Sequence, residues 1–282
     1  MTVIFKASTR EGHVLKTFVE ILQHNLKSVI FELSKDNILL RTMNDGRTVL
    51  FDLKLNSECF SIFYVKYTNK KSDIIDEKTG KILVGLNLVH FYKMLKQIKK
   101  RDSIELFIND ENMEELGIKI IPKEKNRTTT SFIKIQHIQS IDTDVPEGYG
   151  KPVLIPSGEF QKMCKGLTQI SNVTQISAKG FTIKFSSDAG DVMKRCTEFG
   201  ENDSDEESNI DDDDKEEYKD EYETEQLIKI SKIAGLNSFM KIYTKEGLPL
   251  LLKSNVGSLG ELCIYLKSKK LQDIESHITE SN

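Results

Sequence analysis

The sequence predicts an α+β fold of two similar domains, each with two short helices packed on antiparallel sheets. Three observations support this prediction. Many short segments alternate apolar and polar residues, as half-buried strands do. Four segments carry apolar residues at helical spacing with lysines off that face. The order of these segments is similar in the two halves of a chain whose 282 residues allow two domains of ordinary size.

The composition is typical of a globular protein with one unusual segment. No apolar run approaches the roughly 20 residues of a membrane span, and the N-terminus lacks the regions of a signal peptide. We therefore expect an intracellular protein. The four cysteines form no CxxC pair, so we expect buried thiols rather than disulfides or a zinc site. Residues 201–225 hold 15 Asp and Glu against 2 Lys, so the rest of the chain is positively charged although the net charge is −4.

The first predicted domain covers residues 1–135, in which strands surround two helices. The first helix, Glu11–Gln23, places Val14, Leu15, Phe18, Ile21 and Leu22 on one face. The second helix, Asn87–Lys100, buries Leu88, Phe91, Leu95 and Ile98 and carries lysines elsewhere. Residues 68–81 are polar and rich in turn formers, which predicts an exposed hairpin extension. The predicted strands are Val3–Lys6, Ser28–Ser34, Asn37–Thr42, Val49–Leu55, Phe60–Tyr67, Ile82–Gly85, Ser103–Asn109, Gly117–Pro122 and Thr130–Ile138.

A connecting loop over residues 136–151 leads to the second predicted domain, residues 152–267. Its first helix lies in Pro156–Ile170, with Ser157 as the expected N-cap. Residues 200–217 form an acidic, low-complexity loop that we expect to be disordered. Thr224 is expected to cap the next helix, which ends near Ile233, and residues 268–282 are expected to form a flexible tail. The predicted strands are Thr174–Ser177, Phe181–Ser186, Val192–Phe199, Tyr218–Glu223, Ser238–Tyr243, Pro249–Asn255 and Gly260–Leu266.

A weak internal repeat connects the two halves. The second helix of each half carries K-x-x-K, at Lys93/Lys96 and at Lys229/Lys232. The strand that follows each helix also matches, S-I-E-L-F-I against S-F-M-K-I-Y. Matches in the same order along two halves indicate a duplicated domain, with chance similarity as the alternative. A basic helix face by itself is typical of a solvated surface, so the recurrence of the pattern is the informative feature.

Several motifs, spread over residues 3 to about 269, resemble one family. They are P-S-G-E-F at 156–160, L-L-R-T-M-N-D at 39–45, G-L-N-L at 85–88 with K-M-L-K at 93–96, V-P-E at 145–147 and L-P-L-L-L-K at 248–253. The residues of these motifs and their order along the chain resemble the eukaryotic-type DNA sliding clamps, the proliferating cell nuclear antigen family. The departures from that pattern and the composition indicate a divergent lineage, such as a large DNA virus or a protist.

The resemblance implies a DNA-clamp (processivity-fold) architecture: a homotrimeric ring of six domains whose helices line a hole around duplex DNA. The implied function is to tether DNA polymerase and other replication and repair proteins as a processivity factor. Lysines that contact phosphates without reading bases suit a ring that slides. The family has a basic residue at the position of Glu225 and a lysine at the position of Thr17, so both positions depart from its pattern. The implied DNA-binding residues, including additional lysines near that surface, are Lys16, Lys93, Lys96, Lys99, Lys100, Lys162, Lys165, Lys229 and Lys232.

The resemblance also implies a front-face pocket for partner peptides of the pattern Q-x-x-[I/L/M]-x-x-[F/Y]-[F/Y]. The implied pocket residues are Met43, Arg47, Leu50, Thr143, Val145, Pro249, Lys267 and Lys269. Arg47 stands where the family has a histidine, and Met43 and Leu50 also fit an ordinary core. Subunits are implied to join edge to edge through strands Thr130–Ile138 and Val192–Phe199, with Ile133, Ile135, Met193 and Arg195 at the interface.

The resemblance implies one further partner, an ATP-dependent clamp loader. It implies action in the nucleus or, for a virus, at a cytoplasmic replication site. We expect no cofactor and no metal. An enzyme is disfavoured, because the chain has no Gly-rich phosphate loop, no HExxH and no nucleophile with a placed base. Asp211–Asp214 lacks the spaced ligands of a calcium loop. The second alternative is a repurposed clamp-fold accessory protein, such as a checkpoint-type hetero-ring subunit or viral transcription factor, that closes no homotrimeric ring.

Overall fold

The computed structural model describes residues 2–66, 73–76, 78–124, 127–138, 143–200 and 218–280, and these divide into two compact units. Unit 1 comprises Met1–Asp45, Leu50–Asp144 and Asn255–Leu262, and unit 2 comprises Gly46–Val49, Val145–Ser254 and Cys263–Asn282. Residues 201–217 of the predicted acidic loop, and residues 68–72 and 77 of the predicted hairpin extension, lie outside the described residues.

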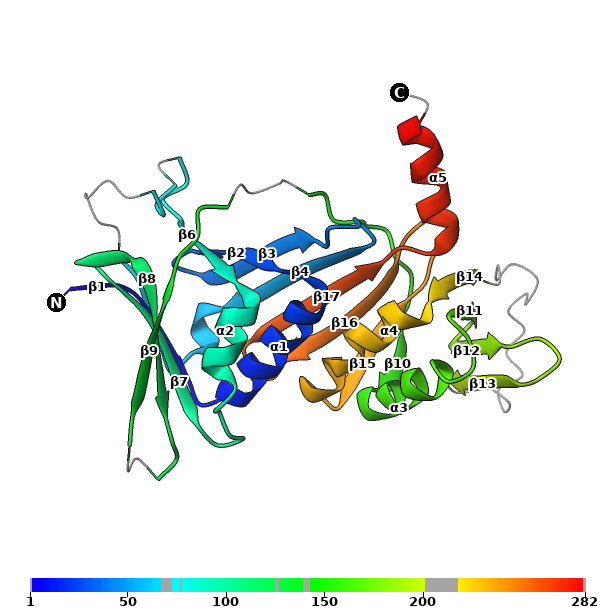
Figure 1. The fold of residues 1–282 in the computed structure, drawn as a ribbon, viewed down its shortest axis with the longest axis horizontal. Coiled ribbons are helices and arrows are strands. Elements are labelled where there is room, and N and C mark those ends of the chain that lie inside the picture. The colour runs from blue at the N-terminus through cyan, green and yellow to red at the C-terminus, as the bar shows by residue number, and fades with distance from the viewer. Residues whose placement is uncertain are drawn as a thin grey trace. The chain divides into compact units, whose positions relative to one another are not determined.

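Unit 1 contains two antiparallel groups of strands (Figure 1). One sheet has the order β5-β1-β7-β8-β9, so β9 lies at an edge. The other group has the order β4-β3-β2-β6, and Asn56 N next to β4 donates to Leu259 O at 2.9 Å. The strands are β1 Val3–Thr9, β2 Ser28–Leu33, β3 Asn37–Met43, β4 Val49–Asn56, β5 Ile62–Val65, β6 Ile82–Asn87, β7 Ser103–Asn109, β8 Asn112–Ile121 and β9 Thr129–Lys134.

Two helices, α1 (Gly12–Asn25) and α2 (Leu88–Leu95), pack side by side in unit 1 (Figure 1). Their apolar faces meet strands of both groups around an apolar cavity of about 50 Å³, whose lining includes Phe18, Phe31 and Phe91. A Cβ on Gly12 would lie 2.9 Å from the carbonyl oxygen of Asp102, so glycine lets α1 begin close to the turn after α2. The cavity shows that this apolar core is not fully packed.

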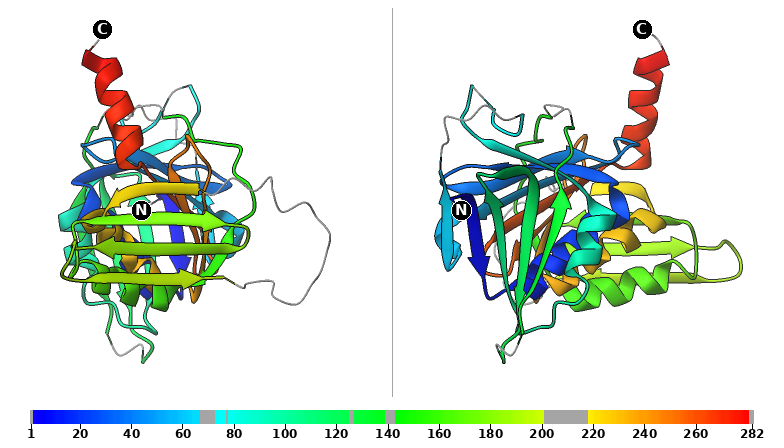
Figure 2. Two further views of the ribbon diagram at one scale, coloured as in Figure 1. Left: turned by 90° about the vertical axis from the view of Figure 1, so that its right-hand side faces the viewer. Right: turned by 60° about the vertical axis from the view of Figure 1, so that its left-hand side comes forward.

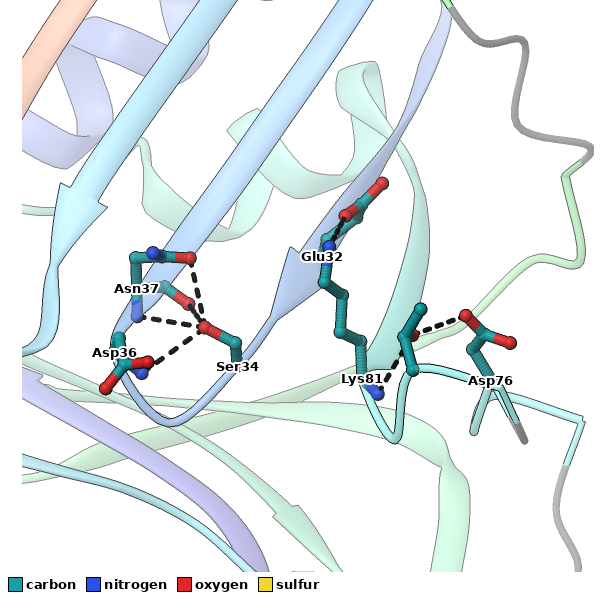
Figure 3. A network of polar contacts seen from close by, with 7 residues as sticks. Glu32, Ser34, Asp36, Asn37, Asp76 and Lys81 are labelled. Atoms are coloured by element: carbon teal, nitrogen blue, oxygen red, sulfur yellow. Dashed lines mark hydrogen bonds and ion pairs between the residues drawn. The ribbon is translucent and has the colours of Figure 1, made fainter.

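Short polar networks fix the turns of unit 1 (Figure 3). Ser34 Oγ accepts from the backbone N–H groups of Asp36 and Asn37 between β2 and β3. Lys81 Nζ forms an ion pair with Glu32 on β2 at 2.8 Å, and Thr79 Oγ1 donates to Asp76. The bond from Thr79 lowers the pKa of Asp76.

Unit 2 repeats the arrangement of helices on sheets. Figure 2 (left) faces the sheet with the order β13-β12-β11-β14, in which β13 is an edge strand. The other group has the order β10-β15-β16-β17. Helices α3 (Ser157–Leu167) and α4 (Thr224–Ile230) pack together, and a 3₁₀ turn at Ser231–Gly235 continues α4. The strands are β10 Val153–Pro156, β11 Val173–Lys179, β12 Thr182–Asp188, β13 Lys194–Phe199, β14 Tyr218–Glu223, β15 Phe239–Tyr243, β16 Leu250–Val256 and β17 Gly260–Leu266.

The interior of unit 2 contains a buried chain of hydroxyl groups. Thr174 Oγ1 lies 3.0 Å from Ser187 Oγ and 2.9 Å from Thr224 Oγ1. All three residues are buried, and the chain joins β11, β12 and the start of α4. Because each buried hydroxyl has a partner, the network avoids the cost of an unpaired polar group and links the helix to the sheet.

Several elements differ from the sequence-based expectations. The second helix ends at Leu95 rather than Lys100, because Asp102 accepts from Lys99 N at 2.9 Å and so stabilises a turn there. Ser157 does not cap α3: it is the first helical residue, and its buried Oγ has no hydrogen-bond partner among the described residues.

Two further elements were not predicted. Strand β10 is a four-residue strand that pairs with β15, where we expected only a loop and a helix. The predicted flexible tail contains α5 (Lys269–Glu280), whose first turn is held by Ser268 Oγ accepting from Leu271 N at 3.3 Å. The cysteines also differ from expectation, since Cys164 is buried but Cys196 is exposed; all four are free.

Candidate nucleic-acid interface

The proposed DNA-binding residues of unit 1 form a positively charged surface on α1, on α2 and on the turn after α2. Lys93 lies in the last turn of α2, and Lys96 follows the helix directly. Lys99 and Lys100 lie in the turn, and all four side chains are exposed. Lys16 on α1 is half-buried, and its Nζ donates to Ile98 O at 2.6 Å. Within the described residues, the four exposed lysines have no carboxylate at ion-pair distance.

His13 shows that the lysines of α1 and of the turn are close together. Burial lowers the pKa of His13 from its usual 6.5, and the charges of Lys16 and then Lys100 lower it further, while Glu20 opposes them. One residue therefore experiences the positive charge of both elements. The imidazole is neutral at pH 7, so His13 adds no charge of its own. We did not predict this residue, although its position three residues before Lys16 puts it on the same helix face.

The corresponding lysines of unit 2 are partly neutralised by acids on the same helices. Lys162 Nζ lies 2.8 Å from Glu159 Oε1 on α3, and Lys229 Nζ lies 2.7 Å from Glu225 Oε1 on α4. The hydrogen bond and charge of Lys229 lower the pKa of Glu225. Lys165 and Lys232 are exposed. The i,i+3 and i,i+4 spacings were visible in the sequence, so these ion pairs could have been predicted.

The two departures from the family pattern have different consequences. Thr17 is buried, and its hydroxyl donates to His13 O at 3.0 Å. A threonine there is a core residue, so it removes no charge from the exposed surface. Glu225 is exposed and paired with Lys229, so it does reduce the positive charge of α4.

The proposed interface strands both lie at sheet edges. Within the described residues, β9 pairs with β8 and β13 pairs with β12. Met193 and Arg195 are exposed, and Arg195 Nη1 donates to Gly166 O at 3.0 Å. Ile133 and Ile135, which we also predicted at the interface, are each only 8 % exposed and face the core. Strand alternation places Phe132, which is 50 % exposed, on the other face.

The proposed peptide-pocket residues fall into both units. In unit 1, Met43 and Thr143 are half-buried, and Leu50 is 4 % exposed, as a core residue would be. The unit 2 residues are Arg47, Val145, Pro249, Lys267 and Lys269.

Two features of the unit 2 group were not predicted. Arg47 is exposed and has a φ of 52°, in the left-handed region. Tyr149 donates its hydroxyl to Pro249 O at 2.7 Å and packs against the rings of Tyr243 and Tyr265. Burial raises the pKa of Tyr149, so it acts as a neutral donor that holds the start of β16.

Other kinds of site receive no support from the described residues. They contain no group of three or more His, Cys, Asp or Glu positioned to hold a metal ion. No helix in this part of the chain is long and apolar enough to cross a membrane. Burial raises the pKa of Cys164 to about 12, so its thiol is protonated and is a poor nucleophile.

Two units that each present lysine-bearing helices on antiparallel sheets define a clamp-type protein with a basic helical surface. Family models agree: residues 4–145 match the N-terminal domain and residues 145–269 the C-terminal domain of proliferating cell nuclear antigen. The chain belongs to the proliferating cell nuclear antigen family. The recognition and the clamp fold predicted from sequence are thereby confirmed.

Relatives at modest identity cover almost the whole chain. A "Probable DNA polymerase sliding clamp 1" of Paramecium bursaria Chlorella virus 1 is 28% identical over 266 residues, covering 92% of this chain and 95% of the relative. Proliferating cell nuclear antigen of Dictyostelium discoideum is 23% identical over 271 residues, covering 94% and 99%. That of Chaetomium thermophilum is 22% identical over 269 residues, covering 94% and 98%. These relatives support a DNA clamp role.

Proposed function

We propose that this chain is a non-enzymatic sliding clamp that closes around duplex DNA as a homotrimer and tethers DNA polymerase. The observation that carries the proposal is the exposed lysine surface on the helices of unit 1, together with the lysines of α3 and α4 in a second unit of the same design. A surface of flexible ammonium groups attracts phosphates of any sequence. Contacts with phosphates read no bases, so the attraction does not fix the clamp at one site.

The lysine side chain suits sliding. Each ammonium group is a compact charge on a four-carbon stem, so its contact can pass from one phosphate to the next without movement of the helix. The apolar faces of α1 and α2 fix the helices against the core, as the burial of Phe18 and Leu95 illustrates. The energetic cost of sliding is therefore limited to small rearrangements of exposed side chains.

Ring closure is proposed to join β9 of one subunit to β13 of the next. Among the described residues each is the edge strand of its sheet, and an added strand could pair with the outward backbone groups of such an edge. Phe132 on β9 and Met193 just before β13 are exposed apolar side chains that such pairing would cover. Ile133 and Ile135 would then support the strand from the core side.

We further propose that partner proteins dock by a short peptide at the predicted pocket residues and that an ATP-dependent loader opens the ring. The expected place of action is the nucleus or, in a viral lineage, a cytoplasmic replication site. The names of two relatives, a DNA polymerase sliding clamp and a proliferating cell nuclear antigen, support a role at a replication site.

Charge removal tests the DNA-binding proposal directly. The variant K93Q/K96Q/K162Q/K165Q should fail to stimulate a DNA polymerase on primed template after loading. The matched control removes four exposed lysines from strands instead, K54Q/K184Q/K219Q/K241Q, and should stimulate normally. Normal stimulation by the first variant would contradict the assignment of the channel.

A second candidate function is a repurposed clamp fold that closes no homotrimer. The observation that favours it is the pairing of Lys162 and Lys229 with acids, which weakens the basic surface of unit 2. Light scattering over a range of concentrations separates the two. A mass near three times 32.2 kDa supports the self-closing ring, and a monomer at high concentration supports the repurposed fold.

A further inference from the structure

Helix α5 lies beyond the part of the chain that matches the family's C-terminal domain. The match to the family model ends at residue 269, and α5 runs from Lys269 to Glu280. The helix follows the end of β17 almost directly, and it contacts β14 before it projects beyond the strands of unit 2 (Figure 2, right). Its first residues are therefore joined to a segment, Lys267–Lys269, that belongs to the proposed peptide-docking site.

The side chains of α5 turn back onto that segment. Glu275 Oε2 lies 2.6 Å from Lys267 Nζ, and Gln272 Nε2 donates to Lys267 O at 3.1 Å. The Lys267 side chain is only 15 % exposed, while that of Glu275 is 55 % exposed. Lys267 N is also occupied, since it donates to Thr48 O at 2.9 Å. The amine, the carbonyl and the N–H of Lys267 are thus all satisfied within unit 2.

Few apolar contacts hold α5 in place. Among its residues 269–277, only Lys269, Leu271 and Gln272 are half-buried, and Ile274 is 48 % exposed. A second ion pair, between Lys270 Nζ and Glu246 Oε1 at 3.2 Å, ties the helix to the turn before β16 and is exposed on both sides. An exposed ion pair contributes little stability, so α5 depends mainly on the Lys267 contacts and on a few half-buried side chains, and displacing it costs little compared with displacing a core helix.

We propose that α5 is a built-in competitor for partner peptides, holding the Lys267–Lys269 segment closed until a partner displaces it. This inference rests on the proposed peptide docking. The partner that fits is an extended peptide with a backbone N–H for Lys267 O and a carboxylate that replaces Glu275 at Lys267 Nζ. Competition of this kind favours acidic clamp-binding peptides over neutral ones.

Peptide affinity measures this competition. The probe is a fluorescein-labelled peptide of the pattern Q-x-x-[I/L/M]-x-x-[F/Y]-[F/Y] with a flanking aspartate, titrated by anisotropy against the purified trimer. Deletion of residues 270–282 should tighten binding on the order of ten-fold, because an ion pair and a hydrogen bond no longer compete. E275Q keeps the helix and should tighten binding about two- to five-fold. The gain from E275Q should shrink in 0.5 M salt, since screening already weakens the pair.

The matched control is D273N, which removes the same charge from an exposed position on the same helix. It should leave the affinity unchanged. Equal or weaker binding by both the deletion variant and E275Q would overturn the proposal. If the peptide binds neither the full chain nor any variant, the deletion included, both the proposed competition and the proposed peptide docking are wrong. Trimer mass and duplex binding of the same samples do not depend on α5, so failure of the clamp function itself would be visible separately.

Discussion

The helix pairs of the two units have the same design but differ in how their charges are compensated. On α2 and in the turn after it, Lys93, Lys96, Lys99 and Lys100 are exposed without carboxylate partners among the described residues. On α3 and α4, Lys162 and Lys229 each have a glutamate within 2.8 Å on the same helix. The number of lysines on a helix is thus a poor measure of its positive charge. Unit 1 is expected to supply most of the attraction for a polyanion.

The interiors under the helices differ as well. Beneath α1 and α2, apolar side chains line a cavity of about 50 Å³. Beneath α3 and α4, the hydroxyls of Thr174, Ser187 and Thr224 are bonded to each other inside the core. Apolar contacts are non-directional, whereas a hydroxyl network fixes its members in one geometry. The start of α4 is therefore positioned by directional bonds in addition to apolar contacts.

The largest expected effect comes from removing the unpaired lysines. The variant K93Q/K96Q/K99Q/K100Q should weaken duplex binding by about 10²–10³-fold near 0.15 M salt, because each lost phosphate contact lowers the salt slope by about 0.9. The measurement is duplex affinity by anisotropy over a series of salt concentrations. The matched variant K162Q/K165Q/K229Q/K232Q should lose less. Equal slopes for the two variants would refute the difference between the units.

The next effect concerns the interior of unit 2. T174V removes the central hydroxyl of the chain and leaves Thr224 Oγ1 without its bond, while Ser187 Oγ keeps its bond to Val173 O. The free energy of unfolding should fall by about 1–3 kcal/mol, the usual cost of an orphaned buried group. Chemical denaturation measures this loss. T168V removes an exposed hydroxyl and should change stability little, so a similar loss there would argue against a special role for the network.

A smaller effect should make unit 2 resemble unit 1. E159Q/E225Q releases Lys162 and Lys229 from their intrahelical pairs without removing any lysine. Duplex affinity should rise about two- to five-fold, since two negative charges near the phosphates are lost and exposed pairs are weak. The same salt series measures it, with E198Q, an exposed glutamate on β13, as the single-charge control. A fall in affinity would mean that the glutamates position the lysines rather than neutralise them.

The sequence predicted the family, the two-domain clamp fold and most helices and strands. It did not predict which lysines are paired with acids or where individual helices and strands end. The spacing of Leu88, Phe91, Leu95 and Ile98 continues past the end of α2, because the following turn keeps Ile98 buried. Periodicity therefore cannot show that the helix stops at Leu95. Strand β10 is too short, and too close to two prolines, for its alternation to stand out. Helix α5 lies in a polar segment that we interpreted as a flexible tail.

The smallest expected effect is also the most local test of the unit 1 surface. The pKa of His13 should lie below 6.5 by NMR titration of its ring protons, and K100Q should raise it, because the charge of Lys100 opposes protonation. K93Q is the control, since Lys93 is not among the charges that act on His13, and it should leave the titration unchanged.

The folded protein binds the His13 proton less well than the unfolded chain, whose histidine titrates near 6.5. The contribution of His13 to stability is therefore fully present above that pH and decreases as the pH falls through it. If K100Q leaves the pKa of His13 unchanged, the lysines of α1 and of the turn do not share one surface. The contrast between the two units would then lose its structural basis.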